Sequence, residues 1–490
     1  MYFRFLIAAS IVSCMTVLFI THVFADKSKL SIEHIRDLPI MQSLGHKIFF
    51  DTNLSNPPGQ ACSSCHDPKT AFSDPILDLP VSRGAVVGKT GIINTPTVMY
   101  TAFIPAFHFN PEENLFVGGQ FLDGRESSLE AQAKKPFLNP DEMNNPDIAS
   151  VIEKIRNASY ADEFKSVFGQ DAIDDIDKAY DYVAAALASF ERSAILNPFT
   201  SKYDYYLAGT VKLSEQEERG LQLFEAENKG NCAACHPSRP VDGKPPLFTD
   251  FTYDNLGVPS NQKILEIKGA NFVDIGLGKT VKDNTNAEPG ADNGKFKVSS
   301  LRNIARTAPY MHNGVFTSLK EVVDFYNTRD TDVKWAKPEI ATTMNTEELG
   351  NLGLSDQEVD DIVAFMRTLS DGYELGEHAA IEPEDAIKLP YVRVEGQDVA
   401  SKIYSVRMES TTLDKGSLQY HVTQLEELSL TDNSYPTDIP YYSLDTGILE
   451  IPAIKKEHED GNQSTYVAQF KQIPPNGNLV FELTYVKAWQ

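Results

Sequence analysis

Two copies of one five-residue cysteine motif constrain this chain more than any other feature of its sequence. The motifs read Cys-Ser-Ser-Cys-His at 62–66 and Cys-Ala-Ala-Cys-His at 232–236. Two thiols separated by two residues can form thioethers to both vinyl groups of one haem, while the histidine that follows binds its iron. A disulfide scaffold, a redox-active cysteine pair and a zinc site are the alternatives. The repeated pattern favours two covalent c-type haems, bound by Cys62, Cys65 and His66 and by Cys232, Cys235 and His236.

The first 25 residues have the composition of an export signal. A basic residue precedes an apolar run from Phe5 to Ile20, and Val-Phe-Ala at 23–25 suits cleavage after a small residue. We therefore predict a signal peptide over residues 1–25 and a periplasmic or otherwise exported protein. The alternatives are an uncleaved N-terminal anchor and a lipid anchor on Cys14, and only these would make a membrane a partner. Without Cys14, every remaining cysteine belongs to a haem motif.

The chain is strongly acidic, with a formal net charge of -25. Binding to phosphate backbones needs a basic face, so this charge argues against nucleic acid as a partner. A basic protein partner would be attracted, although acidity can also serve solubility alone. The hydrophobic fraction of 41% and the absence of low-complexity tracts indicate globular domains.

Helical periodicity dominates the chain up to about residue 370. Ser214 and Glu217 form a capping box that starts a helix ahead of the second cysteine motif. Asp-Gly-Tyr at 371–373 has the composition of a linker, and beyond it the pattern changes to strand-like alternation, as at 391–394. We predict a mainly α fold with two cytochrome c-like haem domains and long loops, plus a small C-terminal β-sandwich-like domain. The predicted boundaries are 26–205 and 206–375 for the haem domains and 376–490 for the β-rich domain.

Four further stretches accompany the cysteine motifs in a fixed order. They read Leu-Gly-His-Lys-Ile-Phe-Phe-Asp at 44–51, Asn-Thr-Pro-Thr-Val at 94–98, Gln-Phe-Leu-Asp-Gly-Arg at 120–125 with Gln132 and Asn-Pro-Asp-Glu-Met at 139–143, and Leu-Arg-Asn at 301–303 with Thr-Ala-Pro-Tyr-Met-His at 307–312. With these stretches, residues 35–370 resemble the bacterial di-haem cytochrome c peroxidase family, including its MauG branch. The β-rich end lies outside the resemblance.

The resemblance assigns peroxide chemistry to the first haem and electron transfer to the second. His66 would be the proximal ligand of the reactive haem, with Glu142 moving the proton and Gln132 supplying a polar contact. Classical members block the open face with a loop histidine until they are reduced, but 67–94 contains no histidine here. We therefore expect an open first haem without reductive activation, as in the MauG branch. His108 is the nearby residue that can replace the missing ligand, although a loop histidine is more often a surface residue.

For the second haem the resemblance implies His236 as the proximal ligand and one of two sixth ligands. The family's ligand lies seventeen residues after the proline of Thr-Ala-Pro, which here is Tyr326. Classical members carry methionine at this position and the MauG branch carries tyrosine. Met311 is the alternative, because His/Met ligation suits electron transfer. An anionic phenolate favours oxidised iron, so Tyr326 would favour oxidation of a protein substrate.

Two more features follow from the resemblance. Family members usually have tryptophan between the haems where this chain has Leu122, which predicts slower inter-haem transfer or the use of another aromatic residue. The family also holds calcium between the haem domains, with oxygen ligands that suit this ion. The corresponding residues here are Asn94 through its side chain and Thr307 and Pro309 through their carbonyls.

Three functions are therefore open. The first is a cytochrome c peroxidase that reduces hydrogen peroxide with electrons from a small c-type cytochrome or copper protein. The second is a MauG-like enzyme that oxidises aromatic residues of a partner protein. The third is a non-enzymatic electron-transfer cytochrome, which needs both haems to be six-coordinate. The first is favoured because both enzymes share its opening step with peroxide.

Overall fold

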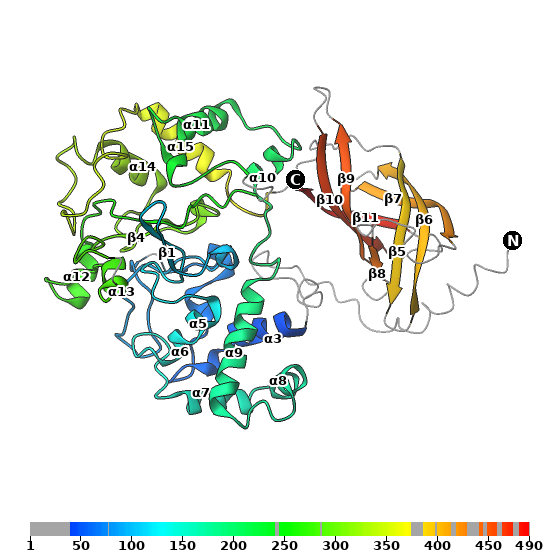
Figure 1. Ribbon diagram of the computed structural model, residues 1–490, viewed down its shortest axis with the longest axis horizontal. Helices are drawn as coiled ribbons and strands as arrows, with labels where there is room; N and C mark the ends of the chain where they lie inside the picture. The colour runs from blue at the N-terminus through cyan, green and yellow to red at the C-terminus, as the bar shows by residue number, and fades with distance from the viewer. Residues whose placement is uncertain are drawn as a thin grey trace.

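The computed structural model describes residues 40–76, 78–240, 245–284 and 287–373, together with seven strands between 386 and 489. The predicted signal peptide at 1–25, with Cys14, lies outside the described residues. Within the described residues, no helix is both long and apolar enough to cross a membrane. Both cysteine motifs lie in the helical part of the chain, which is coloured from blue to yellow in Figure 1.

The helical part has two hydrophobic cores, and each defines a lobe. The core of the first lobe draws its residues from between Leu44 and Phe199, and the core of the second from between Tyr203 and Leu369. The predicted dominance of helices up to about residue 370 is confirmed. The first lobe contains α3 (Ile40–Phe49), α4 (Cys62–Cys65), α5 (Leu129–Ala133), α6 (Lys135–Leu138), α7 (Ile148–Arg156), α8 (Ala161–Phe168) and α9 (Ile176–Glu191).

The second lobe follows the same plan. The capping box predicted at its start is confirmed: the Ser214 side chain accepts from the backbone N–H of Glu217, and the Glu217 side chain accepts from that of Ser214. A short ribbon of β3 (Tyr253–Asp254) and β4 (Phe296–Lys297) joins the loops. The helices are α10 (Lys202–Leu207), α11 (Glu215–Glu225), α12 (Gln262–Lys268), α13 (Leu277–Val281), α14 (Leu319–Thr328) and α15 (Asp356–Arg367).

Both lobes use the same helix crossing to support their cysteine motif. A Cβ atom added to Gly45 of α3 would lie 1.9 Å from the carbonyl oxygen of Ala186 in α9, and one added to Gly220 of α11 would lie 1.9 Å from that of Asp361 in α15. These distances leave no room for any side chain. Each crossing is filled by a fully buried phenylalanine, whose burial contributes about 2–3 kcal/mol. The phenylalanines are Phe190 and Phe365.

A hairpin from the first half of the chain packs on the second lobe. It consists of β1 (His108–Asn110) and β2 (Leu115–Val117). Phe116 of this hairpin joins Tyr253 and Leu277 in a small hydrophobic cluster, and the Tyr253 hydroxyl donates to the Gly118 carbonyl. The long loops after each motif therefore hold the two lobes together.

The C-terminal strands differ from the predicted sandwich because they join in one closed barrel. The order around the barrel is β10-β11-β7-β6-β5-β8-β9, and all neighbours are antiparallel except β5 and β8. Alternation of apolar and polar residues indicates that each strand buries one face. Strands of a sandwich and of a barrel both do so, and the sequence pattern therefore does not distinguish the two folds. β11 lies next to α10 (Figure 1). The strands are β5 (Ala386–Gly396), β6 (Val399–Thr412), β7 (Leu418–Leu428), β8 (Tyr441–Ser443), β9 (Ile448–Glu457), β10 (Gln463–Ile473) and β11 (Val480–Trp489).

Candidate functional site

The first cysteine motif forms one helical turn that presents its histidine. Cys62 and Cys65 begin and end α4, and the backbone N–H of His66 donates to the Cys62 carbonyl over 2.9 Å. The His66 Nδ1 lies 3.1 Å from the Phe72 carbonyl oxygen, which can only accept. This contact favours the tautomer with the proton on Nδ1, which leaves Nε2 as the nitrogen that would bind iron. Burial lowers the pKa of His66 to about 4, which keeps the ring neutral.

The second motif repeats this arrangement. The His236 N–H donates to the Cys232 carbonyl over 2.9 Å, and its Nδ1 donates to the Phe248 carbonyl over 2.7 Å. Burial again lowers the pKa of the ring to about 4. The four cysteines form no disulfide, and within the described part of the chain no three His, Cys, Asp or Glu side chains gather as a metal cluster. Paired thiols beside an oriented imidazole fit a covalent haem better than a disulfide scaffold or zinc.

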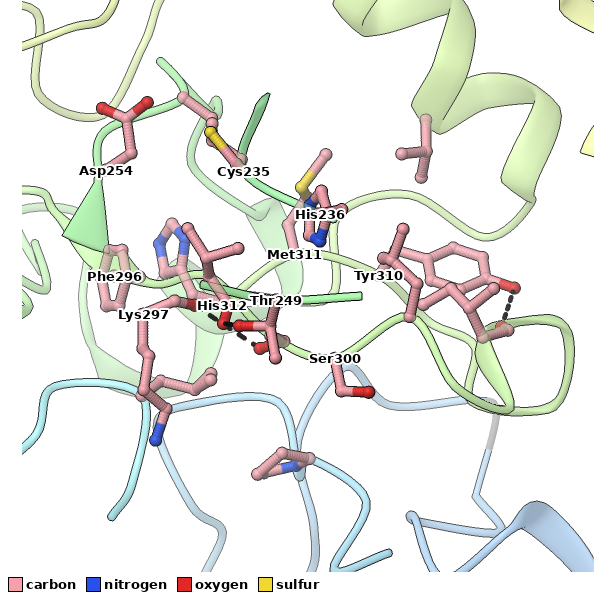
Figure 2. Close-up of a pocket in the computed structure, with 18 of the residues that line it drawn as sticks. Cys235, His236, Thr249, Asp254, Phe296, Lys297, Ser300, Tyr310, Met311 and His312 are labelled. Carbon is pink, nitrogen blue, oxygen red and sulfur yellow. Dashed lines mark hydrogen bonds between the residues drawn. The ribbon is translucent and has the colours of Figure 1, made fainter. Parts of the chain in front are cut away.

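A large cavity surrounds the second motif. Its volume is about 340 Å³, and it reaches from the second motif to the segment 94–101 of the first lobe. Figure 2 shows the side chains of His236 and Met311, both of which line this cavity. Such a space, lined mainly by apolar groups and closed on one side by a cysteine pair, fits a haem. Its lining includes Cys232, Cys235, His236, Met311 and Tyr326.

Both candidate sixth ligands lie in this cavity lining. Tyr326 is on α14, and its phenol is close enough to the second motif that Cys232 and Cys235 affect its pKa electrostatically. Burial is the main cause of the raised pKa of this phenol. Met311 has a left-handed backbone conformation, with φ of 70°. The cavity therefore brings together both predicted alternatives with His236.

Glu142 lies near the first motif, in the turn after α6. Burial raises its pKa, while a hydrogen bond of 2.8 Å from Asn139 and the charge of Arg125 act in the opposite direction. The charge of Glu142 in turn contributes to the raised pKa of the Cys62 and Cys65 thiols. A carboxyl group with a raised pKa at this place is suited to take up and release a proton. Gln132, the other predicted residue, is half-buried on α5.

A second buried carboxyl group near the first motif escaped the sequence analysis. Glu191, the last residue of α9, is 6% exposed, and burial raises its pKa to about 8. Its charge is the second cause of the raised pKa of the Cys62 thiol. A helical Glu-Arg pair gives no sequence signal of this burial.

His108 is exposed and belongs to strand β1. Its Nδ1 lies 2.9 Å from the Ala106 carbonyl in the same hairpin. The aromatic side chains of that hairpin pack on the second lobe around Tyr253. The structure therefore places His108 as a surface histidine, in agreement with the usual role of a loop histidine.

The predicted calcium ligands meet at the junction of the lobes. The Nδ2 atom of Asn94 donates to the Pro309 carbonyl oxygen over 2.5 Å, across 215 residues of sequence. The backbone N–H of Asn94 donates to the His312 carbonyl over 2.8 Å. Thr307, the third predicted ligand, lies in the same loop as Pro309, at the end of the turn 304–306. The structure thus brings an amide side chain and the loop carbonyls together.

Lys297 is a buried cation that the sequence did not reveal. Its Nζ donates to the carbonyls of Gly119 and Phe121, and its backbone N–H donates to the carbonyl of Leu122 over 2.8 Å. Figure 2 shows this side chain running from the second lobe toward the blue ribbons of the first. Burial lowers its pKa to about 7, against the opposing effect of Asp123. Lys297 therefore fixes the loop that carries Leu122.

Asp371 corrects the prediction of a linker at 371–373. Its carboxylate accepts hydrogen bonds from the Tyr100 hydroxyl, the Asn303 side chain and the backbone of Thr200. Burial raises its pKa, and the charge of Arg302 lowers it. The segment has polar turn residues, but these residues bind both lobes to each other.

Comparison with known proteins agrees with this geometry. A family profile described as di-haem cytochrome c peroxidase matches residues 39–212. The chain is 40% identical to the methylamine utilization protein MauG of Paracoccus denitrificans, over 68% of this chain and 88% of that protein. It is 31% identical to the cytochrome c551 peroxidase of Nitrosomonas europaea, over 67% of this chain and 80% of that protein. The crystal structure of the diheme peroxidase BthA from Burkholderia thailandensis superposes with a TM-score of 0.63 at 34% identity, covering 68% of this chain and 86% of that one.

The chain therefore belongs to the di-haem cytochrome c peroxidase family. It is an oxidoreductase of the class that acts on peroxide, and its two cysteine motifs carry two c-type haems. The predicted resemblance is confirmed for the helical part of the chain.

Proposed function

We propose that the chain reduces hydrogen peroxide at the haem of the first motif, while the haem of the second motif relays or stores electrons. The observation that carries the proposal is the half-buried Glu142 carboxyl, whose pKa is raised and whose charge acts on the Cys62 and Cys65 thiols. A haem held by Cys62, Cys65 and His66 would supply redox-active iron for the exchange of electrons with peroxide. Side chains of this protein move the proton and supply the polar contact.

Glu142 holds and moves the proton. Breaking the O–O bond of peroxide requires a proton on the departing oxygen, and a carboxyl group can take it from one oxygen and return it to the other. The hydrogen bond from Asn139 orients the Oε1 atom of Glu142, which leaves Oε2 for the substrate. Gln132 on α5 supplies the polar contact for the developing charge.

Tyr326 is the proposed sixth ligand of the second haem, and Met311 is the alternative. Tyr326 sits on a regular helix, α14, whose Ser318 cap fixes its start. A ligand on a helix has a defined direction, whereas Met311 belongs to a loop. Optical and magnetic spectra of the oxidised protein distinguish phenolate from thioether ligation. Tyr326→Phe is expected to change these spectra, and Met311→Leu to leave them unchanged.

We also propose one calcium ion between the lobes, bound by Asn94, Thr307 and Pro309. The support is that the two residues lie side by side: the Asn94 amide nitrogen donates to the Pro309 carbonyl, and a turn of the amide would direct its oxygen, a ligand that suits calcium, toward the same place. Periplasmic or other export remains our proposal for the location, with a small redox protein as the electron donor. The domain boundaries at 26–205, 206–375 and 376–490 remain predictions of the same kind.

The test compares two neighbouring carboxylates. Glu142→Gln removes the proton-carrying group, and Asp141→Asn is the matched control, since Asp141 is paired with Lys89 and Lys268 instead of buried near the motif. The holoenzyme is mixed with peroxide and followed by stopped-flow absorbance. A slow Glu142→Gln variant beside an unchanged Asp141→Asn variant supports the proposal. Equal rates for Glu142→Gln and the unmodified protein would refute it.

A second candidate function is oxidation of aromatic residues on a partner protein. The observations that favour it are the 40% identity to MauG and a tyrosine at position 326 in the cavity lining. Turnover of peroxide with reduced cytochrome c separates the two functions. Fast steady-state consumption supports the peroxidase, and a reaction with peroxide that is slow to turn over with this donor supports the protein-modifying enzyme.

A further inference from the structure

Residues 94–101 link the two cysteine motifs directly. At one end, Asn94 binds the loop of the second lobe through the carbonyls of His312 and Pro309. In the middle, the backbone N–H of Val98 donates over 3.2 Å to the carbonyl of Phe72, the same carbonyl that accepts from the His66 ring. The segment therefore touches the support of the first haem and also lines the cavity of the second.

Tyr100 is the tyrosine of this segment, and it belongs to both sites. It is 3% exposed and is part of the core of the first lobe together with Phe72. It also lines the cavity that contains Cys232 and His236. A redox-active side chain placed between the two sites shortens the distance that an electron must cross. Leu122, in the same cavity lining, has no side chain that can be oxidised in this way.

The Tyr100 phenol has a proton acceptor. Its hydroxyl donates to Oδ2 of Asp371 over 2.8 Å and accepts from the backbone N–H of Phe199 over 2.9 Å. Oxidation of a phenol makes its proton strongly acidic, so a neutral tyrosyl radical forms easily only where a base is already in contact. Burial strengthens Asp371 as a base, whereas the charge of Arg302 weakens it. The Arg302 guanidinium, 4.9 Å from the ring centre, disfavours a cation radical and so favours loss of the proton.

Tyr310 and Tyr160 each have only one part of this combination. Tyr310 lines the same cavity, but its hydroxyl donates to the Ile304 carbonyl, which is too weak a base to take a proton. Tyr160 donates to a carboxylate, Asp51, over 2.6 Å, but it lies in the core of the first lobe and outside the cavity lining. Tyr310 therefore tests whether a place in the cavity lining is enough for oxidation without a carboxylate base, and Tyr160 tests whether a carboxylate base is enough outside the cavity lining.

We propose that Tyr100 is a redox relay between the two haem sites, with Asp371 as its proton acceptor. One electron leaves the Tyr100 phenol for the haem iron that hydrogen peroxide has oxidised, and the phenol proton moves to Oδ2 of Asp371. The product is a neutral tyrosyl radical. An electron from the second haem, together with return of the proton, restores the phenol. This inference rests on the proposed peroxide reaction, which supplies the oxidant.

The experiment is freeze-quench electron paramagnetic resonance of the holoenzyme mixed with stoichiometric hydrogen peroxide and no electron donor. We expect a radical signal that narrows when the protein contains ring-deuterated tyrosine. The signal is lost in Tyr100→Phe and retained in the controls Tyr310→Phe and Tyr160→Phe. Asp371→Asn, which keeps the phenol and removes the base, slows its appearance. The haem absorption spectrum and urea midpoint of each variant report its folding.

The possible outcomes separate the relay from the function on which it rests. If peroxide changes the haem absorption but no tyrosyl signal forms, or if Tyr100→Phe keeps the full signal, the relay is wrong while the peroxide reaction stands. If the haem absorption does not respond to peroxide, both fail. Should Tyr100→Phe not fold, 3-fluorotyrosine incorporated at position 100 is used instead. An altered hyperfine pattern then supports the relay, and an unaltered pattern refutes it.

Discussion

The buried ammonium of Lys297 predicts a pH dependence of folding that one substitution removes. Lys297 is 8% exposed, and burial lowers its pKa from the ordinary 10.5 to about 7. Below about pH 7 both the folded and the unfolded chain hold this proton, so folding carries the full desolvation cost. Above it the folded chain releases the proton while the unfolded chain keeps it up to about pH 10.5. Stability from this group therefore rises with pH across that window.

The size of the effect follows from the pKa difference. Each pH unit in the window adds about 1.4 kcal/mol to the free energy of unfolding, which gives about 2–3 kcal/mol between about pH 7 and pH 9. Lys297→Met has no group to titrate, although it leaves the carbonyls of Gly119 and Phe121 without their donor. That loss is the same at each pH. The pH dependence of the difference in free energy of unfolding between the unmodified protein and Lys297→Met therefore reports the titration of Lys297 alone.

Urea unfolding of both proteins over this pH range measures the difference. The matched control is Lys320→Met, because Lys320 on α14 is exposed and Asp360 raises its pKa, which places its titration above the window. We expect the difference in free energy of unfolding between the unmodified protein and Lys297→Met to rise with pH, and the corresponding difference for Lys320→Met to stay constant. A flat difference for Lys297 would show that its ammonium is solvated or paired within the folded protein, and the reasoning would be refuted.

Three further predictions concern the site and its support. Glu142→Gln slows the reaction with peroxide by about 10²–10⁴-fold without changing haem content. Because burial raises the pKa of Glu142, the rate of the unmodified enzyme falls as the pH falls through this raised value. The rate of the variant, measured by stopped-flow absorbance, lacks this dependence on pH. Removal of calcium by a chelator lowers the melting temperature of the unmodified protein, and Asn94→Ala shows the lower value with or without the chelator. Asp204→Asn destabilises by about 3–5 kcal/mol in urea unfolding, since its arginine partner is 1% exposed, whereas Asp360→Asn, from a pair whose side chains are 54% and 46% exposed, costs about 0–1 kcal/mol.

The sequence predicted features whose cause is local. The two motifs position Cys62, Cys65 and His66 within one helical turn, so five residues suffice to specify the arrangement. The capping box of Ser214 and Glu217 is equally local, and the structure confirms it. Glu142 and Tyr326 came from the family resemblance, because nothing near them in the chain indicates their role.

Contacts between distant residues were not predictable from one sequence. Tyr100 and Asp371 are 271 residues apart, and Asp371 lies in a short polar segment with the composition of a linker. Lys297 follows a phenylalanine in a two-residue strand, and nothing in that pattern shows that its ammonium is buried. Burial of polar groups depends on which loops the fold brings together, and periodicity reports only the apolar side of each element.

The main-chain acceptors of His66 and His236 constrain how the two irons can differ. Each ring is oriented by a carbonyl oxygen of the polypeptide, at Phe72 and Phe248, which any amino acid at those positions would also provide. Substitution of Phe72 or Phe248 therefore leaves each carbonyl acceptor in place. Differences between the two sites are then expected from the other residues that enclose each haem, such as Pro96, which contacts His66 and has no counterpart at His236.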